Sequence, residues 1–208
     1  MKYIDEPLIK YLEDASSSNP TPGGGSVAGL TAALACSMAN MVCNFTIGKK
    51  AYLSVDEKTR SIFAQSKNLM QDLLNLTVLD TEAYSFVSSA YKLPKNTEHE
   101  KQIRKTSIQE ACIKALEVPE KIMEKADNLL SILYELVDIG NKNLITDTGV
   151  ASILSKAAID SAILNIKINL SFIDDKKYVD DKINKILKIE ENCILKNKSI
   201  MEKVNSLL

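Results

Sequence analysis

The chain has 208 residues, of which 45% are apolar and 25% charged, and its formal net charge is -1. This length suits one domain with a substantial core, and the near-neutral charge gives no reason to expect binding to nucleic acid or to an anionic membrane. The lack of tryptophan and an aromatic content of only 5% also argue against a base-stacking surface.

Nearly every stretch between the glycines and prolines has helical character, and no segment alternates as a strand does. We expect six helices, at about 6–17, 26–47, 56–91, 97–139, 148–173 and 178–204. Pro119 falls inside the fourth and should kink or restart it. The pattern predicts a single all-α domain over residues 1–208, a bundle of long antiparallel helices around a central charge-free helix.

The charge-free segment 26–47 is long enough to cross a membrane. Its serines, threonines, asparagines and many alanines instead favour a helix buried among other helices, so we expect no membrane association. The acidic N-terminus lacks the apolar region of a secretory signal. The four cysteines (Cys36, Cys43, Cys112 and Cys193) form no CxxC pair and the chain has one histidine. We therefore expect reduced thiols, a cytoplasmic location and no metal site.

The predicted helix 56–91 carries a carboxylate where an apolar residue belongs. Asp80 falls on the apolar stripe between Leu73 and Val87. A carboxylate there is costly unless it is paired, and burial raises its pKa, which suits a proton-transfer group. The alternative is a structural hydrogen bond or ion pair inside the bundle.

A glycine-rich turn, Pro22-Gly23-Gly24-Gly25-Ser26, precedes the charge-free helix. Glycines permit close backbone approach, and the N-terminus of the next helix offers unpaired N–H groups to an anion or a carbonyl oxygen. The turn is not a P-loop, because neither a preceding strand nor a Gly-Lys-Ser/Thr sequence is present. A flexible connector with Ser26 as helix cap is the equally good alternative.

Other polar residues are weaker candidates. Asn40 and Asn44 share one face of the charge-free helix and either line a pocket or tie helices together. Asn165 lies on the apolar stripe of the predicted helix 148–173, with Asn169 one turn further on. Three other candidates have ordinary explanations: Lys49 and Lys50 as cations near the end of a helix, and Asp147 as an N-cap.

Several segments together resemble the cyclodeaminase/cyclohydrolase family, which includes the C-terminal part of formiminotransferase-cyclodeaminase and free-standing methenyltetrahydrofolate cyclohydrolases. The segments are 22–28 (PGGGSVA), 44–50 (NFTIGKK), 80–84 (DTEAY), 93–97 (LPKNT), 115–119 (ALEVP), 140–147 (GNKNLITD) and 165–170 (NIKINL). Each is weak alone, but their order and spacing over residues 5–175 are specific.

The resemblance implies a helical, dimeric, cytoplasmic protein that acts on a tetrahydrofolate derivative, with no metal and no permanently bound cofactor. It implies catalytic roles for Asp80 and Lys49. The implied substrate-binding residues are Gly23, Gly24, Gly25, Ser26, Asn40, Asn44, Lys50, Asn141, Asp147 and Asn165. The substrate's tail can carry several glutamates, and we expect Lys49 or Lys50 to hold it. A homodimer and a separate formiminotransferase are the implied protein partners.

Within that family two reactions meet at the 5,10-methenyl ring. The resemblance favours 5-formiminotetrahydrofolate cyclodeaminase, which releases ammonia, and leaves 5,10-methenyltetrahydrofolate cyclohydrolase, which gives 10-formyltetrahydrofolate, as the alternative. A non-catalytic folate-binding helical protein is the second alternative.

Overall fold

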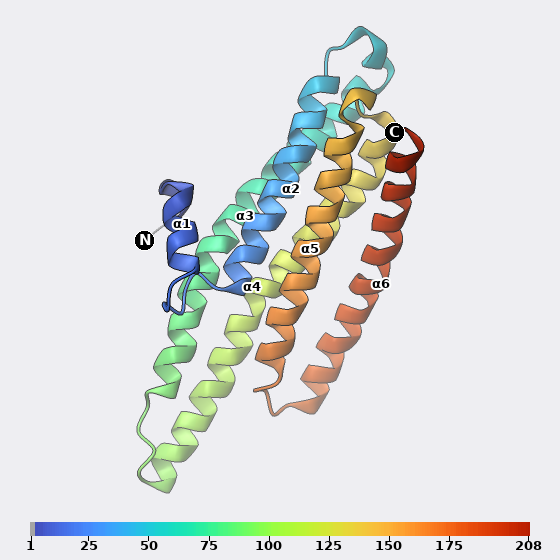
Figure 1. The fold of residues 1–208 in the computed structure, drawn as a ribbon. Helices are drawn as coiled ribbons and strands as arrows, with labels where there is room; N and C mark the ends of the chain where they lie inside the picture. Colours follow the sequence, from blue (N-terminus) through green and yellow to red (C-terminus); the bar gives the residue numbers. More distant parts are fainter. Residues whose placement is uncertain (1–2) are drawn as a thin grey trace.

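The structure is a computed structural model that describes residues 3–208, and within that range it contains helices and no strand (Figure 1). The α-helices are α1 (Leu8–Ala15), α2 (Gly24–Thr46), α3 (Asp56–Tyr91), α4 (Glu98–Ile139), α5 (Ile145–Leu170) and α6 (Lys176–Ser206). Short 3-10 helices occur at Tyr3–Asp5, Lys50–Val55 and Lys142–Leu144. The all-α prediction is confirmed.

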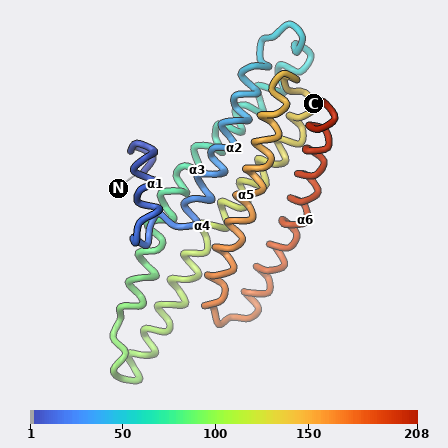
Figure 2. Tube along the Cα trace, in the orientation of Figure 1, coloured from blue at the N-terminus to red at the C-terminus, as the bar shows by residue number. Residues whose placement is uncertain are grey.

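Helices α2 to α6 run side by side as an elongated bundle, as the ribbon and the tube both show (Figure 1, Figure 2). Helix α2 packs mainly on α3 and α5, and α4 packs on α3 and α5 from the other side. Helix α6 covers α4 and α5. The short α1 stands apart beside the bundle, and the α3–α4 hairpin projects beyond the ends of α5 and α6.

The small residues of α2 explain its central place. Ala28, Ala32, Ala35 and Ala39 are fully buried, so neighbouring helices approach its backbone closely. At Gly29 a Cβ atom would stand only 2.6 Å from Thr77 Oγ1 of α3, so only glycine fits this crossing. The charge-free composition of this helix therefore reflects packing on several sides.

The predicted helix boundaries agree best where the sequence carries a cap. Helix α3 spans the predicted residues 56–91, and α4 begins after Thr97, whose side chain accepts a hydrogen bond from the Glu100 N–H. The Glu100 carboxylate accepts from the Thr97 N–H at 2.9 Å, which completes a capping box. Helix α1 is shorter than predicted and begins after Pro7, which is its N-cap.

The expectations of a helix restart at Pro119 and of an N-cap at Asp147 are wrong. Helix α4 continues through Pro119, which lies buried in the core, so tertiary packing outweighs the lost hydrogen bond. Asp147 is not an N-cap, because α5 begins two residues earlier, at Ile145 after Leu144, and Asp147 lies in its first turn.

Two segments, Gly24–Thr46 and Lys142–Leu170, are long and apolar enough to cross a membrane by length and composition. In the bundle, 61% of the most apolar window of the first and 50% of the second are buried. Buried core helices can be equally long and apolar, so length and composition alone do not distinguish the core of a helical bundle from a membrane.

Candidate functional site

A cavity of about 320 Å³ lies where the N-terminus of α2 meets α3, α4 and the last turns of α5. Its wall consists of Pro20, Thr21, Gly23, Gly24, Gly25, Asp80, Ala83, Tyr84, Val87, Cys112, Ala115, Asn165, Ile168, Asn169 and Phe172. Among these side chains only Asp80 is ionised at neutral pH in its ordinary state. The cavity is thus an apolar pocket with a few converging polar groups, as small-molecule sites are.

Asp80 lies directly against the backbone of the glycine turn. A Cβ atom on Gly25 would overlap Asp80 Oδ1, so the missing side chain makes room for the carboxylate. Burial raises the pKa of Asp80, and a hydrogen bond from the Ser26 backbone N–H lowers it in part, with a net increase. The result is a carboxyl group that exchanges protons more readily near neutral pH than an exposed aspartate does.

The glycine turn forms the first turn of α2 itself. Gly23 is the N-cap, and Gly24 and Gly25 are already helical. The unpaired N–H groups and the positive dipole end of this 23-residue helix therefore face the cavity. They stabilise negative charge on Asp80 or on a bound oxygen.

Ser26 has a different role from the predicted cap. It is fully buried within α2, and its Oγ lies 3.0 Å from the hydroxyl of Tyr11, the one buried residue of α1. Its backbone N–H is the group that faces Asp80. Ser26 thus links the isolated helix α1 to the carboxylate across the α2 backbone. Sequence reasoning missed Tyr11, because α1 has no other sign of being near the site.

The wall formed by α5 carries two amides. Asn165 Nδ2 donates to the Ser161 carbonyl and Asn169 Nδ2 to the Asn165 carbonyl, both at 2.8 Å. Each amide is thereby oriented, and its oxygen remains an acceptor for donors of a ligand. Asn165 also stands against Gly24, where a Cβ atom would come within 3.2 Å of Nδ2.

Two aromatic lining residues, Tyr84 and Phe172, were not among the predicted site residues. Their spacing was a usable signal: Tyr84 is one turn after Asp80, and Phe172 is two turns after Asn165. Both are partly exposed at the rim of the cavity.

The structure brings together Gly23, Gly24, Gly25, Asp80 and Asn165, but it places Lys49 and Lys50 elsewhere. Both lysines are exposed and follow the other end of α2. A 23-residue helix is about 35 Å long, so neither lysine of the same chain reaches the cavity.

Asn141 and Asp147 also lie at the far end. The Asn141 Nδ2 donates to the Phe45 carbonyl at 2.9 Å and its N–H donates to Thr46 Oγ1, so this residue ties the end of α2 to the α4–α5 connection. Its position is structural, and Asp147 follows it in the first turn of α5.

Asn40 and Asn44, the two asparagines predicted to share one face of α2, differ in their exposure to solvent. Asn44 is exposed, whereas Asn40 is only 8% exposed, and its Nδ2 faces the sulfur of Met70 at 3.8 Å. Asn40 Oδ1 has no hydrogen-bond partner among the described residues. Neither residue lines the cavity at Asp80.

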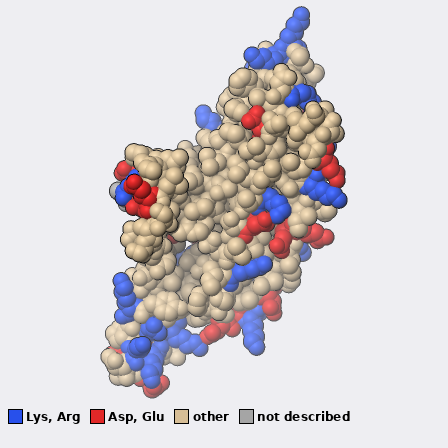
Figure 3. Space-filling model, in the orientation of Figure 1, with Lys and Arg blue, Asp and Glu red and all other residues tan. Residues whose placement is uncertain are grey.

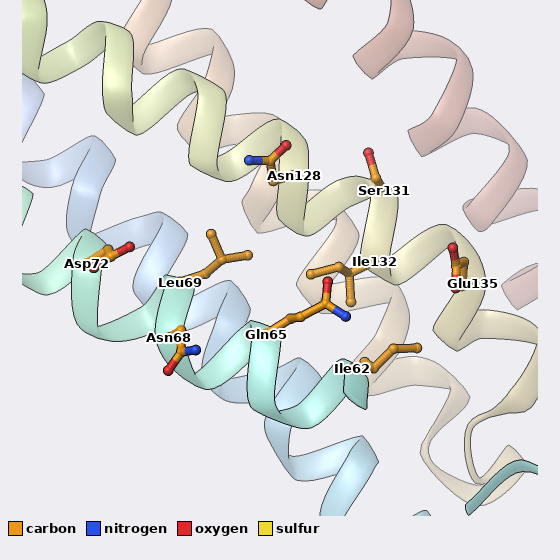
Figure 4. A pocket seen from close by; sticks show the side chains of 9 residues that line it. All are labelled: Ile62, Gln65, Asn68, Leu69, Asp72, Asn128, Ser131, Ile132 and Glu135. Carbon is orange, nitrogen blue, oxygen red and sulfur yellow. The ribbon is translucent and has the colours of Figure 1, made fainter. Parts of the chain in front are cut away.

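A second cavity, of about 460 Å³, lies between α3 and α4 further along the bundle (Figure 4). Gln65 and Leu69 of α3 and Ile132 of α4 point into the space between the two helices. Its carboxylates are already paired, Asp72 with Lys125 at 2.6 Å and Glu135 with Lys58 at 3.0 Å. It is an open groove whose carboxylates are all engaged by lysines.

Within residues 3–208 no group of three or more His, Cys, Asp or Glu side chains is arranged to hold a metal ion. The four cysteines are buried and unpaired with one another. Burial raises the pKa of Cys36 and Cys43 to about 12, so these thiols are poor nucleophiles.

The whole chain is similar to several known proteins. The methenyltetrahydrofolate cyclohydrolase of Methylorubrum extorquens is 34% identical over 202 residues, 97% of each chain. The formimidoyltransferase-cyclodeaminase of Gallus gallus is 30% identical over 91% of this chain, which spans only 35% of that protein. The solved structure of formiminotetrahydrofolate cyclodeaminase from Thermotoga maritima superposes with a TM-score of 0.81 at 30% identity, covering 99% of this chain and 96% of that one. A family model described as formiminotransferase-cyclodeaminase matches residues 7–188, and the chain therefore belongs to the formiminotransferase-cyclodeaminase family.

Proposed function

We propose that this protein is a folate one-carbon enzyme that acts at the 5,10-methenyl ring of tetrahydrofolate. The observation that carries the proposal is Asp80, a partly buried carboxylate held against the Gly23–Ser26 turn in a largely apolar cavity. The relatives with whole-length matches are named for reactions at this ring, one as a cyclohydrolase and one as a cyclodeaminase.

In the cyclodeaminase reaction, N10 attacks the carbon of the protonated formimino group on N5, whose nitrogen thereby becomes an amino group. The Asp80 carboxylate accepts the proton released from N10 and returns it to the amino group of the tetrahedral centre. Ammonia then leaves and the methenyl cation forms. The same carboxylate, once ionised again, stabilises that cation electrostatically in a site of low dielectric.

In the cyclohydrolase reaction, water attacks the methenyl carbon, and Asp80 accepts one of its protons. The bond between N5 and the carbon breaks as Asp80 returns the proton to N5. The hydroxyl group on the carbon then loses its proton through Asp80 to solvent, which gives the formyl group of 10-formyltetrahydrofolate. Asn165 and Asn169 offer acceptor oxygens to the ring N–H groups of the pterin, while Phe172 and Ile168 supply apolar contact. No step needs a metal or a permanently bound cofactor.

The cyclodeaminase is our first candidate, supported by the Thermotoga maritima structure, and the cyclohydrolase is the second, supported by the Methylorubrum extorquens relative. A spectrophotometric assay separates them. Methenyl absorbance that appears from 5-formiminotetrahydrofolate marks a cyclodeaminase, and loss of methenyl absorbance above the spontaneous rate marks a cyclohydrolase. No change with either substrate contradicts both assignments and leaves a folate-binding protein.

The functional unit in this proposal is a homodimer formed through α2 and α5. Figure 3 shows a broad area that is mostly free of charged residues over α2 and the adjoining part of α5, with charged residues, including the exposed Lys156–Asp160 pair of α5, around it. Its exposed apolar side chains are Val27, Leu34, Phe45, Val150, Ile153, Leu164, Ile168 and Phe172. An exposed apolar patch of this extent is typical of an interface, and Ile168 and Phe172 connect it to the cavity.

The same proposal places the protein in the cytoplasm, with no membrane or nucleic-acid partner. Support comes from four buried unpaired thiols and from the apolar surface of α2, which is used largely within the bundle. If the cyclodeaminase reaction is the physiological one, a separate formiminotransferase supplies the substrate.

A further inference from the structure

Helix α1 is attached to the bundle by few side chains. It stands apart beside the bundle, and Tyr11 is its one buried residue (Figure 1). The Tyr11 ring packs edge-on against the Tyr3 ring, with 5.4 Å between the ring centroids. A cavity of about 220 Å³ lies between this N-terminal segment and the bundle, where Leu30 of α2 and Leu74 of α3 line it. The position of α1 therefore depends strongly on Tyr11.

Ser26 is the residue through which Tyr11 meets the site. The first hydrogen bond of α2 runs from the Val27 N–H to the Gly23 carbonyl at 3.0 Å, so the Ser26 N–H precedes the helical ladder and is free for another acceptor. The Asp80 carboxylate accepts from this N–H. The Ser26 Oγ lies 3.0 Å from the Tyr11 hydroxyl, and both groups are buried. Ser26 thus binds Asp80 through its backbone and α1 through its side chain.

The phenol of Tyr11 also lies close enough to Asp80 to be affected by its charge. Burial raises the pKa of Tyr11, the hydrogen bond with Ser26 lowers it in part, and the charge of Asp80 raises it further. Tyr11 does not line the cavity at Asp80, however. It therefore has no contact with a bound substrate and can influence the reaction only through other residues.

We propose that Tyr11 is a positioning residue for the reaction at Asp80, an inference that rests on the proposed function. Its hydroxyl fixes Ser26, and with it the first turn of α2, in the place where the Ser26 N–H meets the carboxylate. The glycines at 23–25 give this turn little stiffness of its own, so an external contact has to hold it. Without the Tyr11 hydroxyl, the N–H should lose its alignment with Asp80 for part of the time.

The predicted consequence is a change in how the reaction depends on pH. The hydrogen bond from the Ser26 N–H lowers the pKa of Asp80, so weakening this bond should raise that pKa further. Asp80 must be ionised to accept a proton in the proposed reactions. The acid limb of the profile of kcat/KM against pH, where activity falls as Asp80 becomes protonated, should therefore move to higher pH.

The surroundings of Asp80 make this limb a clean measure. Asp80 is the one carboxylate among the residues of the cavity wall. The other titratable side chains in that wall are Tyr84 of α3 and Cys112 of α4, while α2, α5 and the α1–α2 connection contribute none. Phenols and thiols titrate well above carboxyl groups, and burial raises the pKa of Cys112. The Tyr11 phenol behind Ser26 also has a raised pKa.

The kinetic test compares the wild type with Tyr11→Phe in the methenyl absorbance assay across a range of pH. Tyr11→Phe keeps the ring and removes only the hydroxyl. We expect its acid limb at higher pH and a kcat that is about three- to tenfold lower near neutral pH, because one hydrogen bond of the site is weakened. Ser26→Ala keeps the backbone N–H and should cause the same shift, and the double variant should shift the limb no further.

The matched control is Tyr3→Phe. It removes the hydroxyl of the neighbouring ring, which donates to Asp14 at 3.0 Å within the N-terminal segment, and it should leave the pH profile unchanged. A Tyr11→Phe enzyme with the acid limb of the wild type would overturn the positioning role. A purely structural anchor would lower the fraction of folded protein without moving that limb.

A carbon-13 NMR titration of the aspartate carboxyl groups measures the pKa of Asp80 without turnover, with Asp80→Asn used to identify its signal. The pKa should be higher in Tyr11→Phe than in the wild type and unchanged in Tyr3→Phe. This result in a protein that turns over neither folate would refute the proposed function and leave the link from Tyr11 to Asp80 standing. Turnover with the same Asp80 pKa in wild type and Tyr11→Phe would do the reverse.

Discussion

Asp80 Oδ1 occupies the space that a side chain on residue 25 would fill, so the carboxylate and the glycine define each other's position. Three glycines in sequence predict conformational freedom, but the structure assigns a specific reason to Gly25. Its backbone lies directly against the Asp80 carboxylate, which also accepts a hydrogen bond from the neighbouring Ser26 N–H. Several expected outcomes follow from this contact.

Gly25→Ala should displace the Asp80 side chain, because the new methyl group and Oδ1 cannot coexist. We expect turnover to fall about 100-fold or more, since catalysis is sensitive to small displacements of a reacting group. Steady-state kinetics together with circular dichroism checks this. Gly149→Ala is the control, because its Cβ would lie against the side chains of Val204, at 3.3 Å, and Met201, at 3.8 Å, between α5 and α6. Full activity in Gly25→Ala would show that the carboxylate position is irrelevant.

Asp80→Asn should remove proton transfer and keep the shape of the site. We expect a loss of about 10²- to 10⁴-fold in kcat, the usual contribution of a placed acid–base group. The matched control is Asp72→Asn, two turns earlier on α3, which removes an exposed carboxylate paired with Lys125 and should leave kcat unchanged. Near-normal kcat in Asp80→Asn would refute the catalytic role.

The pKa of Asp80 also predicts how stability depends on pH. Because burial raises this pKa above the ordinary value of 3.8, the folded state binds more protons than the unfolded state between 3.8 and the raised pKa. Stability is therefore lost as the pH rises through that window. Asp80→Asn should unfold at a higher urea concentration than the wild type at neutral pH, and the difference should vanish near pH 3.

The pKa of Glu120 is lowered, so its contribution to folding stability should depend on pH in the direction opposite to that of Asp80. Burial raises its pKa, but hydrogen bonds from Lys182 and Lys185 outweigh burial and lower it overall. The contribution of Glu120 to folding stability is present above the ordinary carboxyl pKa and is lost as the pH falls through the lowered pKa. Glu120→Gln should cost about 1–3 kcal/mol at neutral pH, and the cost should shrink as the pH falls below the ordinary carboxyl pKa toward the lowered one. Parallel pH profiles for Glu120→Gln and Asp80→Asn would contradict both assignments.

The sequence predicted the bundle and half of the site because both depend on local patterns. The stripe that places Asp80 among apolar residues is a property of one helix, and the capping box at Thr97 fixes where α4 begins. Contacts between helices could not be predicted in this way, because they do not follow from a pattern within one segment. The hydrogen bond between the Tyr11 and Ser26 hydroxyl groups joins two segments that share no sequence pattern. Packing in the core keeps α4 helical on both sides of Pro119.

Helix geometry argues against the substrate-binding role expected for Lys49 and Lys50. Both residues follow a helix that begins at the glycine turn, and helix geometry alone separates its ends by about 35 Å. The resemblance to a family grouped these segments as parts of one site, whereas the fold of one chain keeps them apart. The wall of the cavity at Asp80 itself contains no lysine or arginine.

Tyr11 should anchor α1 to the site through Ser26, and a double-mutant cycle measures that link. Tyr11→Phe and Ser26→Ala each break the same 3.0 Å hydrogen bond between buried groups, so each should cost about 1 kcal/mol of unfolding free energy. The double variant should cost less than the sum, with a coupling of about 0.5–1.5 kcal/mol. Additive losses would show that the two hydroxyl groups do not stabilise each other.

The proposed homodimer predicts that a charge on the α2–α5 face separates the subunits. Leu164 of α5 is 67% exposed, and in the proposed interface a carboxylate there would have to be buried without a partner. Leu164→Glu should therefore convert a dimer into a monomer in light scattering coupled to gel filtration. Leu195→Glu is the matched control, because Leu195 is 60% exposed on α6, outside the face. A monomeric wild type would refute the homodimer, and a Leu164→Glu variant that stays dimeric would place the interface elsewhere. If the dimer is also needed to close the cavity at Ile168 and Phe172, the monomeric variant should show a raised KM with its helical content unchanged.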